Sequence, residues 1–423
     1  MRLRSGKRTA TALALATASA AAVACSALIG VEDVRLSGRS DAEPEDSGED
    51  RDVSRRPDGA SRLPSVQLAA GFLHTCARTL DGKVRCWGDN GAGQLGDGIS
   101  FDAGERSPAL VPQDVPGVTD AVQIASGASH SCVVKRGGTV ACWGVNTFGQ
   151  LGDGTTARSS SPVNVIGVSD AVSIACGTSF TCVLTTKRKV SCWGANYSGQ
   201  LGDGTKVDRP TAAFVSQLDG VTAVATAENH ACAVVAGGAV QCWGKNSEGQ
   251  LGNGSTTDSL FPTPLASLAG VEQIVAASRF TCVRLGSGQV SCWGANTLGQ
   301  LGTGSPNPSP NPSPATTSVS DALSIWVGYE HACAVRKTGA VVCWGAAGSG
   351  QVGSGSVAED ASVPRPTAVV GVSGALGVST SGDHSCATTD TGAVFCWGGN
   401  SLGELGNGTT QRAYAAVPVT SFP

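Results

Sequence analysis

The sequence GTVACWGVNTFGQLGDG, at residues 138–154, decides the fold of this chain because close copies of it recur along almost the whole length. Each copy has a Cys-Trp-Gly tripeptide followed by a glycine-rich turn, and a second Cys lies ten positions upstream. The tripeptides begin at Cys86, Cys142, Cys192, Cys242, Cys292, Cys343 and Cys396. Their starts are 56, 50, 50, 50, 51 and 53 residues apart, and a period of this size predicts a stacked or radial repeat architecture.

Each repeat contains four segments of strand length. In the second repeat they are residues 107–112, 118–127, 129–135 and 139–144, and Gly, Pro or Asp bounds each of them. Four short strands are the content of one propeller blade. The sequence therefore predicts an all-β fold, a seven-bladed β-propeller with four-stranded blades over residues 64–423. We expect residues 415–422 to supply the first strand that blade one lacks, so that the C-terminal strand closes the ring.

The last two strands of each repeat form a hairpin whose loop sets the register. In the first repeat the loop closes at Thr79 and Lys83 over a three-residue turn that ends in Gly82. This register places Cys76 opposite Cys86, close enough for a disulfide. Reduced thiols or zinc sites are the alternatives, but zinc favours shorter Cys spacings. The predicted disulfides are Cys76–Cys86, Cys132–Cys142, Cys182–Cys192, Cys232–Cys242, Cys282–Cys292, Cys333–Cys343 and Cys386–Cys396. Arg188 replaces the turn glycine in the third repeat, where we expect backbone strain.

The N-terminal segment has the features of an export signal. Residues 1–24 begin with basic residues, continue into an Ala-rich apolar stretch and end just before Cys25, which predicts a signal peptide. A Cys at the cleavage site indicates a lipid anchor, with plain secretion as the alternative. Residues 25–63 are acidic, polar and without periodicity, and we interpret them as a disordered tether. These features predict an exported protein, either a bacterial cell envelope lipoprotein or an extracellular protein.

The charge balance argues against nucleic acid as a partner. The chain has 29 basic and 33 acidic side chains, and removal of residues 1–24 takes away four basic ones, which leaves a net charge of −8. Such a surface repels phosphate backbones. We therefore expect no nucleic-acid binding, and membrane contact through the lipid anchor only.

The candidate chemical groups all have simpler structural interpretations. The five histidines, each two residues before the first Cys of a repeat, occupy a slot that Phe180 and Phe280 fill elsewhere, which indicates a packing role. The Gly-Gln-Leu-Gly-Asp-Gly runs suggest calcium or phosphate loops, but their Asp is not constant, and we expect turns braced by a repeated Asn.

The motif tryptophans are expected in the core rather than in a ligand-stacking ring. Trp326 and Tyr329 are candidates for exposure, and Cys176 for a buried thiol. No catalytic residue, metal site or cofactor is predicted.

The motif at residues 138–154, 238–254 and 288–304 resembles the regulator of chromosome condensation repeat family. The resemblance spans residues 64–423 and implies a seven-bladed propeller. The family's namesake is a nucleotide exchange factor for a small GTPase on chromatin, other relatives are scaffolds, and one secreted bacterial relative inhibits β-lactamases through one face. The signal peptide and the predicted disulfides fit the last of these better than a nuclear protein.

Partner binding is expected where the repeats differ. Three connections, residues 99–113, 303–320 and 354–366, depart in length or composition, and all follow the glycine-rich turn. The second is rich in proline and is expected to be an extended, polyproline-like chain. We predict that they emerge on one side of the ring and form the interaction face. The candidate binding residues are Phe101, Arg106, Asn307, Asn311, Glu359 and Asp360.

The sequence thus favours a non-enzymatic, monomeric binding or scaffold protein that presents a rigid ring to a protein or glycan partner. A secreted enzyme inhibitor of the β-lactamase-inhibitor kind is the first alternative. A nucleotide exchange factor is the second, by family resemblance alone. A sialidase-like enzyme is a third, but it needs an Arg cluster and a Tyr nucleophile, and the chain has three tyrosines.

Overall fold

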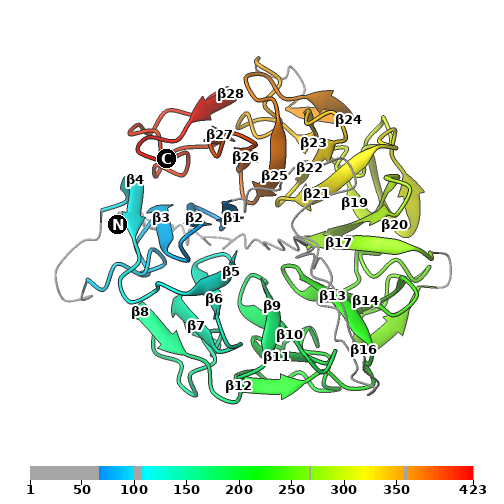
Figure 1. The fold of residues 1–423 in the computed structure, drawn as a ribbon. Coiled ribbons are helices and arrows are strands. Elements are labelled where there is room, and N and C mark those ends of the chain that lie inside the picture. The colour runs from blue at the N-terminus through cyan, green and yellow to red at the C-terminus, as the bar shows by residue number, and fades with distance from the viewer. Residues whose placement is uncertain (1–65, 100–106, 266–267, 357–360, 423) are drawn as a thin grey trace, which may run out of the picture.

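Residues 66–99, 107–265, 268–356 and 361–422 are described in a computed structural model of the chain. They form strands and connecting turns, and no helix occurs among them, so this part of the chain holds no helix that could cross a membrane. The strands make seven four-stranded antiparallel sheets arranged around a common centre (Figure 1). The predicted fold, a seven-bladed propeller, is confirmed.

Every blade is a meander in which consecutive strands pair, so blade one is β1–β4 and blade seven is β25–β28. The first strands of neighbouring blades contact one another around the ring and are its innermost elements (Figure 1). They are β1 (Gln67–Ala70), β5 (Ala121–Ser126), β9 (Ala171–Cys176), β13 (Val221–Thr226), β17 (Val271–Ala277), β21 (Ala322–Val327) and β25 (Ala375–Thr380).

The second and third strands form the hairpin that carries the cysteines. The second strands are β2 (His74–Arg78), β6 (His130–Lys135), β10 (Phe180–Thr185), β14 (His230–Val235), β18 (Phe280–Leu285), β22 (His331–Arg336) and β26 (His384–Thr389). The third strands are β3 (Val84–Gly88), β7 (Val140–Gly144), β11 (Val190–Gly194), β15 (Ala239–Gly244), β19 (Val290–Asn296), β23 (Val341–Ala346) and β27 (Val394–Gly398).

The fourth strands are the outer edges of the blades and are only partly buried. They are β4 (Ala109–Asp114), β8 (Ser159–Asn164), β12 (Arg209–Phe214), β16 (Ser259–Pro264), β20 (Asn307–Thr316), β24 (Ser362–Ala368) and β28 (Ala413–Pro418).

The hairpin register is the predicted one. The amide of Thr79 donates to the carbonyl of Lys83 at 2.9 Å, and Gly82 has a φ of 82°. Cys76 lies opposite Cys86, and the equivalent cysteines pair in every other blade. All seven predicted disulfides are present, with Cα atoms 4.0–4.1 Å apart. Arg188 adopts a φ of 60°, the left-handed conformation expected from its position.

The predicted blade boundary and ring closure are wrong. The segment assigned to the start of blade two is β4, which pairs with β3 in blade one. Likewise β28 pairs with β27 and completes blade seven, not blade one. In every blade the fourth strand pairs with the third strand that directly precedes it in the chain. Among the described residues, no strand from one end of the chain completes the blade at the other end. The ring closes instead by side-chain packing: Val419 and Phe422 lie in one cluster with Trp87 of blade one, and the Phe422 and Trp87 rings are 6.1 Å apart.

The proline-rich connection is extended, as predicted, but it is a strand of blade five rather than an unpaired polyproline-like chain. Residues 307–316 form β20, the longest strand, which pairs with β19 through Asn311 opposite Gly294 and Asn307 opposite Asn296. An outer strand accepts prolines because one of its edges has no neighbour that requires the missing amide hydrogens.

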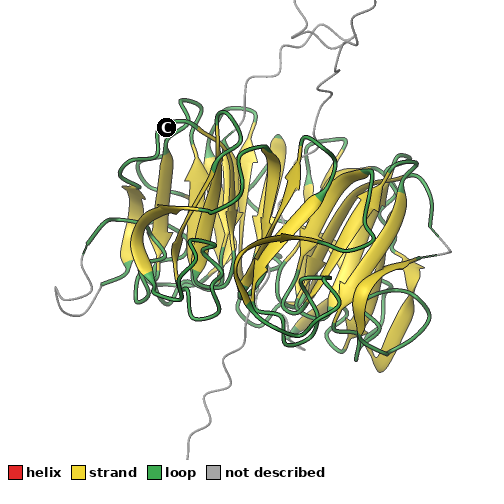
Figure 2. Ribbon diagram, turned by 90° about the horizontal axis from the view of Figure 1, so that it is seen from below, coloured by secondary structure: helices red, strands yellow, loops and turns green. Residues whose placement is uncertain are grey.

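The meander gives the ring two distinct faces, between which the strands run (Figure 2). Connections from first to second and from third to fourth strands share one side, which we call the turn face because it carries the glycine-rich turns. Connections from second to third strands and between blades share the opposite side, which we call the hairpin face. The chain enters β1 at the hairpin face.

Candidate functional site

The predicted binding residues lie mostly outside the described residues. Phe101, Arg106, Glu359 and Asp360 fall there, as does Cys25. Asn307 and Asn311 lie on β20 in blade five, and the Asn311 side chain donates to the carbonyl of Gly294 at 3.3 Å. The described parts of these connections that precede β4, β20 and β24 adjoin the turn face, because they join a third strand to a fourth.

The motif tryptophans are buried contacts between blades. The indole of Trp193 in blade three donates to the carbonyl of Gln150 in the glycine-rich turn of blade two at 2.9 Å. Gly152 of that turn, with a φ of 71°, lies so close to the indole that an added Cβ would be 2.6 Å from its nitrogen. All seven tryptophans make the same hydrogen bond to the preceding turn. The repeated motif is therefore a blade-to-blade interface, which confirms the core interpretation of the tryptophans.

The five histidines belong to the same interface. Each is buried, and its Nε2 meets a hydroxyl in the next blade at 2.8–2.9 Å. The pairs are His74–Ser131, His130–Thr181, His230–Thr281, His331–Ser385 and His384–Thr75. The last pair joins blade seven to blade one. The packing role expected for the histidines is thus confirmed, with a polar contact that the spacing did not reveal.

The hydroxyl partner of His130 fixes the tautomer of its imidazole. Thr181 uses its only hydrogen to donate to the Gln150 carbonyl at 3.0 Å, so the Nε2 of His130 must be the donor to Thr181. The Nδ1 atom of His130 is buried without a hydrogen-bond partner. Burial lowers the pKa of His74, His130, His230 and His331 to about 3 and that of His384 to about 4. These groups are neutral at pH 7, and protonation would bury an uncompensated charge.

Two interfaces replace the polar pair by an apolar one. Phe180 and Phe280 take the histidine position, and both are buried. Phe180 shares a cluster with Ala231 of blade four, and Phe280 shares one with Ala332 of blade six. Ala231 and Ala332 stand at the position where the other repeats have a hydroxyl. The sequence contained this signal, because an alanine occurs in that column only after a repeat with Phe.

The glycine-rich turns are braced by their own asparagines, as predicted. Asn146 accepts from the Leu151 amide at 2.9 Å and donates to Asp153 at 3.2 Å. Asp153 also accepts from the amide and hydroxyl of Thr155 at 3.0 and 2.9 Å. These carboxylate oxygens are engaged within the turn, which fits a structural role better than a calcium site. In blade six Ala347 stands at the Asn position, and its amide donates to Ala361 instead.

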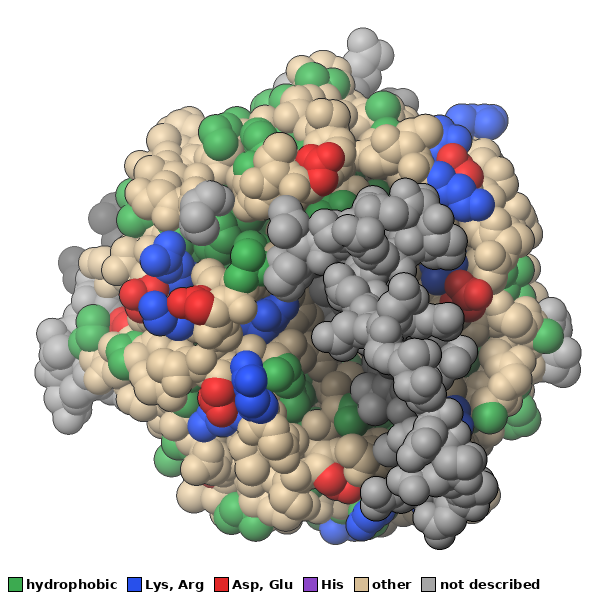
Figure 3. Space-filling model, in the orientation of Figure 1, with side chains coloured by type: hydrophobic (Ala, Val, Ile, Leu, Met, Phe, Trp, Pro, Cys, Tyr) green, Lys and Arg blue, Asp and Glu red, His purple; other side chains and the backbone are tan. Residues whose placement is uncertain are grey.

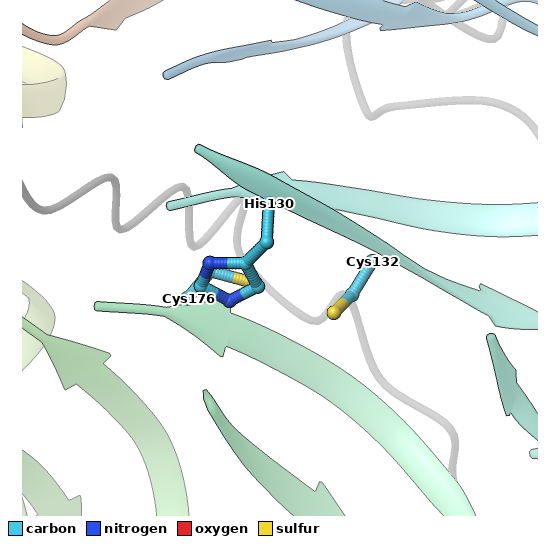
Figure 4. A group of neighbouring side chains, drawn as sticks. All are labelled: His130, Cys132 and Cys176. Carbon is cyan, nitrogen blue, oxygen red and sulfur yellow. The ribbon is translucent and has the colours of Figure 1, made fainter. Parts of the chain in front are cut away.

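Cys176 lies beside a histidine and a disulfide. Its sulfur and potential ligand atoms of His130 and Cys132 lie within 4.8 Å of one another, and Figure 4 shows the imidazole over the Cys176 side chain. Cys132 is bonded to Cys142 and is no thiolate ligand. The Cys176 sulfur lies 3.7 Å from the carbonyl of Ala125 in the neighbouring blade. The buried thiol predicted for Cys176 is confirmed.

The turn face carries aromatic and charged side chains near the ring centre. Phe72 and Tyr329 meet edge to face with centroids 6.4 Å apart. Arg279 lies between Glu248 and Glu330, at 4.0 and 3.9 Å. Tyr329 is half-buried.

Trp326, by contrast, is buried, so the prediction of its exposure is wrong. It lies on the inner strand β21 and packs in the core between blades six and seven.

The hairpin face has a different composition. In six blades the second residue of the inner strand is bulged out of the ladder, and in four of these it is an exposed apolar side chain: Val122, Val172, Leu323 and Leu376. Ion pairs such as Arg85–Asp114 and Arg336–Asp321 lie toward the same face. In the view of Figure 3, basic and acidic side chains are interspersed around the ring, and no extended patch of one sign appears among the described residues.

Comparison with protein families identifies the repeat. A model described as "RCC1-like domain" matches residues 33–381, and one described as "Regulator of chromosome condensation (RCC1) repeat" matches residues 377–404.

Characterised relatives match over shorter stretches. The chain is 39% identical over 100 residues to the probable E3 ubiquitin-protein ligase HERC4 of Rattus norvegicus, which is 24% of this chain and 9% of that protein. It is 32% identical over 114 residues to the ultraviolet-B receptor UVR8 of Arabidopsis thaliana, 27% of this chain and 25% of the receptor. A secretion-regulating guanine nucleotide exchange factor of Bos taurus is 33% identical over 105 residues, 22% of each chain. The matched part is thus a quarter or less of each relative.

Solved structures share the fold. Prp20p of Saccharomyces cerevisiae superposes with a TM-score of 0.71 at 20% identity, covering 83% of this chain and 88% of Prp20p. Human WBSCR16 superposes with a TM-score of 0.70 at 22% identity, covering 80% of this chain and 94% of WBSCR16.

Proposed function

This chain belongs to the family of RCC1-like domains, and from that premise we propose that it is a non-enzymatic binding protein. It acts outside the cytoplasm and presents its rigid ring to a protein or glycan partner. Binding is what the family scaffold offers: Prp20p, which has the same fold, has binding properties to Gsp1p and histones. The repeats of the present chain supply structure rather than chemistry, because their histidines, tryptophans and turn carboxylates are engaged in contacts within and between blades.

The observation that carries the proposal is the set of seven disulfides, one in each blade. They indicate an oxidising, extracytoplasmic environment. A ring stapled in every blade also holds its surface loops in fixed positions, which suits recognition because little conformational entropy is lost on binding. The protein acts as a monomer, and the proline residues of outer strands such as β20 disfavour pairing with a second copy at these open edges.

The export signal completes the proposal. Residues 1–24 direct the chain out of the cytoplasm of a bacterium, and Cys25 carries the lipid that holds it at the cell envelope. The described part of the chain enters β1 at the hairpin face, which is opposite the turn face that we propose for partner binding.

The test is site-specific photo-crosslinking on intact cells of the source organism. A crosslinking residue at Tyr197, 49% exposed on the turn face, is compared with one at Leu80, 56% exposed on the hairpin face. A partner captured from Tyr197 and not from Leu80 supports the proposal. Capture only from Leu80, or capture of nothing from either position, contradicts it.

The captured partner also separates the alternatives. A hydrolase whose activity falls on addition of the purified ring would make the protein an enzyme inhibitor. A GTPase that releases nucleotide faster would make it an exchange factor. Chemical turnover of the partner by the purified ring would overturn the non-enzymatic assignment.

The anchor has its own test. The variant Cys25→Ser should move the protein from the membrane fraction to the soluble envelope fraction. Retention of this variant on the membrane would contradict the lipid anchor.

A further inference from the structure

One cavity on the turn face is lined by residues that differ from those at the same positions of the other repeats. This cavity, of about 240 Å³, lies where blades six, seven and one meet. Its walls include Phe72, Ser349, Asp383, Gly399, Glu404 and Arg412. Pockets for cofactors and drug-sized ligands usually exceed about 300 Å³. The size therefore fits a single long side chain or a similarly small group.

Glu404 replaces a residue that is glutamine in the other six repeats. In those repeats the glutamine Oε1 accepts the amide hydrogen two residues earlier, at 2.8–2.9 Å. Glu404 makes the same contact through Oε2, which accepts from Leu402 at 2.8 Å. Its Oε1 therefore stands where the others have an NH₂ group, and it accepts from the Ser401 hydroxyl at 3.4 Å.

The fold would be served equally well by glutamine at this position. Glu404 is 2% exposed, and burial raises the pKa of its carboxyl group. An acid in such a place is costly unless a cation or donor offsets the charge. At this position the NH₂ donor of glutamine is thus replaced by the acceptor Oε1 of Glu404. A bound ligand explains this replacement better than the hydrogen bonds of the turn do.

Two further charged side chains, Asp383 and Arg412, line the cavity. The Asp383 carboxylate is held by the Ser349 hydroxyl at 3.2 Å and by the Gln351 amide group at 3.4 Å. Arg412 donates to the Gly348 carbonyl at 3.3 Å, which directs its guanidinium to the backbone. Gly399 stands where the other repeats have a larger residue, Ala, Val, Asp or Lys, so no side chain fills this part of the cavity.

Phe72 adds an aromatic wall. It packs edge to face on Tyr329 and lies against Gly382, where an added Cβ would lie 2.4 Å from the Phe72 carbonyl oxygen. An aromatic ring that lines the same cavity as two carboxylates is an arrangement that attracts ammonium and guanidinium groups.

We propose that this cavity is a binding site for a lysine or arginine side chain presented by a protein partner. The inference rests on the proposed binding function and adds the chemistry of the partner: a basic residue that anchors it on the turn face, with Asp383 and Glu404 as the charge partners and Phe72 as the flank.

The test uses two capped tripeptides, Ac-Gly-Lys-Gly-NH₂ and its neutral match Ac-Gly-Gln-Gly-NH₂. Binding is followed by NMR of the tryptophan indoles, because the Trp87 indole donates to the Glu404 carbonyl at 2.8 Å. We expect the lysine peptide to shift the Trp87 signal and to leave that of Trp193 unchanged. The glutamine peptide should shift neither.

The repeat itself supplies the matched variant. Glu404→Gln restores the residue of the other six repeats and keeps the Leu402 contact, so the turn should fold unchanged. Its affinity for the lysine peptide should fall at least tenfold. Asp153→Asn, which copies Asn253 of another repeat, removes the same charge far from the cavity and should change the affinity less than twofold. A lysine peptide that binds no better than the glutamine peptide, or that binds Glu404→Gln as well as the unmodified protein, overturns the inference.

The experiments distinguish a failure of the cation site from a failure of the proposed binding function. A partner crosslinked from Tyr197 while the lysine peptide fails would leave the binding function intact and refute the cation site. Binding of the lysine peptide without any partner captured on cells would support the cation site and contradict the proposed binding function.

Discussion

Blades two and three meet through a histidine and a threonine, whereas blades three and four meet at the same place through a phenylalanine and an alanine. Both interfaces keep the tryptophan-to-turn hydrogen bond, Trp193 to Gln150 in the first and Trp243 to Gln200 in the second. The difference is confined to one pair, His130–Thr181 against Phe180–Ala231. A buried donor needs an acceptor, while a buried phenyl ring needs only a small neighbour. Polar and apolar residue pairs can therefore occupy the same position of different interfaces, provided that both residues of the pair change together.

The largest expected effect comes from acid, which acts only on the polar interfaces. The five imidazoles have folded-state pKa values of about 3 or 4, below the value of about 6.5 in an unfolded chain. As the pH falls through about 6.5 the unfolded state binds protons that the folded state does not, so the stability contributed by these histidines is constant above about pH 7.5 and decreases toward pH 4. The slope is up to about 1.4 kcal/mol per pH unit for each histidine. Denaturant unfolding at pH 7, 6 and 5 measures it, and a flat profile would contradict the neutral buried imidazoles.

The shared tryptophan contact should be equally important in both kinds of interface. Trp193→Ala and Trp243→Ala each remove a large buried ring and its hydrogen bond, and each should lower the free energy of unfolding by about 3–5 kcal/mol. Chemical denaturation of the two variants gives the comparison. A loss at one interface more than twice that at the other would show that the neighbouring pair, and not the tryptophan, dominates the contact.

Mismatched single substitutions should be costly at either interface. Thr181→Ala leaves the His130 donor facing a methyl group, and Phe180→His places an imidazole against Ala231. Each should lower stability by about 1–3 kcal/mol, the cost of a buried polar group without a partner. Thermal and urea unfolding at pH 7.5 measure both. Variants as stable as the unmodified protein would mean that water satisfies these positions.

The smallest effect is expected when both members of a pair change together. The double variant His130→Phe with Thr181→Ala copies the pair Phe180–Ala231 and should lie within about 1 kcal/mol of the unmodified protein at pH 7.5. It should also lose one histidine's share of the acid slope, about 1.4 kcal/mol per pH unit. A double variant as unstable as the sum of the singles would refute the idea that the pair is a unit.

The sequence predicted well what one repeat decides within itself. The ten-residue gap between Cys76 and Cys86 with Gly82 in the loop is enough to place the two sulfurs together, because a short hairpin has one favourable register. The left-handed conformation of Arg188 followed from the same count. Seven such units also predicted the propeller, because four short strands are the content of one propeller blade.

The prediction was poorer wherever two repeats meet. The sequence assigns residues 107–112, which overlap β4, to blade two and residues 415–422, which overlap β28, to blade one, because spacing alone does not say with which neighbour an outer strand pairs. The burial of Trp326 depends on the side chains of the adjacent blade. In the candidate site, the sequence offered Asn307 and Asn311, whereas the cavity is formed by Glu404, Asp383 and Phe72, which are far apart in the chain.

The sequence by itself determined the number of blades, the hairpin register and the disulfides, because these depend on contacts between residues a few positions apart, where the chain has few ways to close. Only the tertiary structure decided how the blades are joined, which histidine meets which hydroxyl and where the repeat is broken into a cavity. Those contacts link residues about 50 positions apart, or about 300 where the ring closes from blade seven to blade one. Their geometry is fixed by the packing of whole sheets, which no local pattern of residues records.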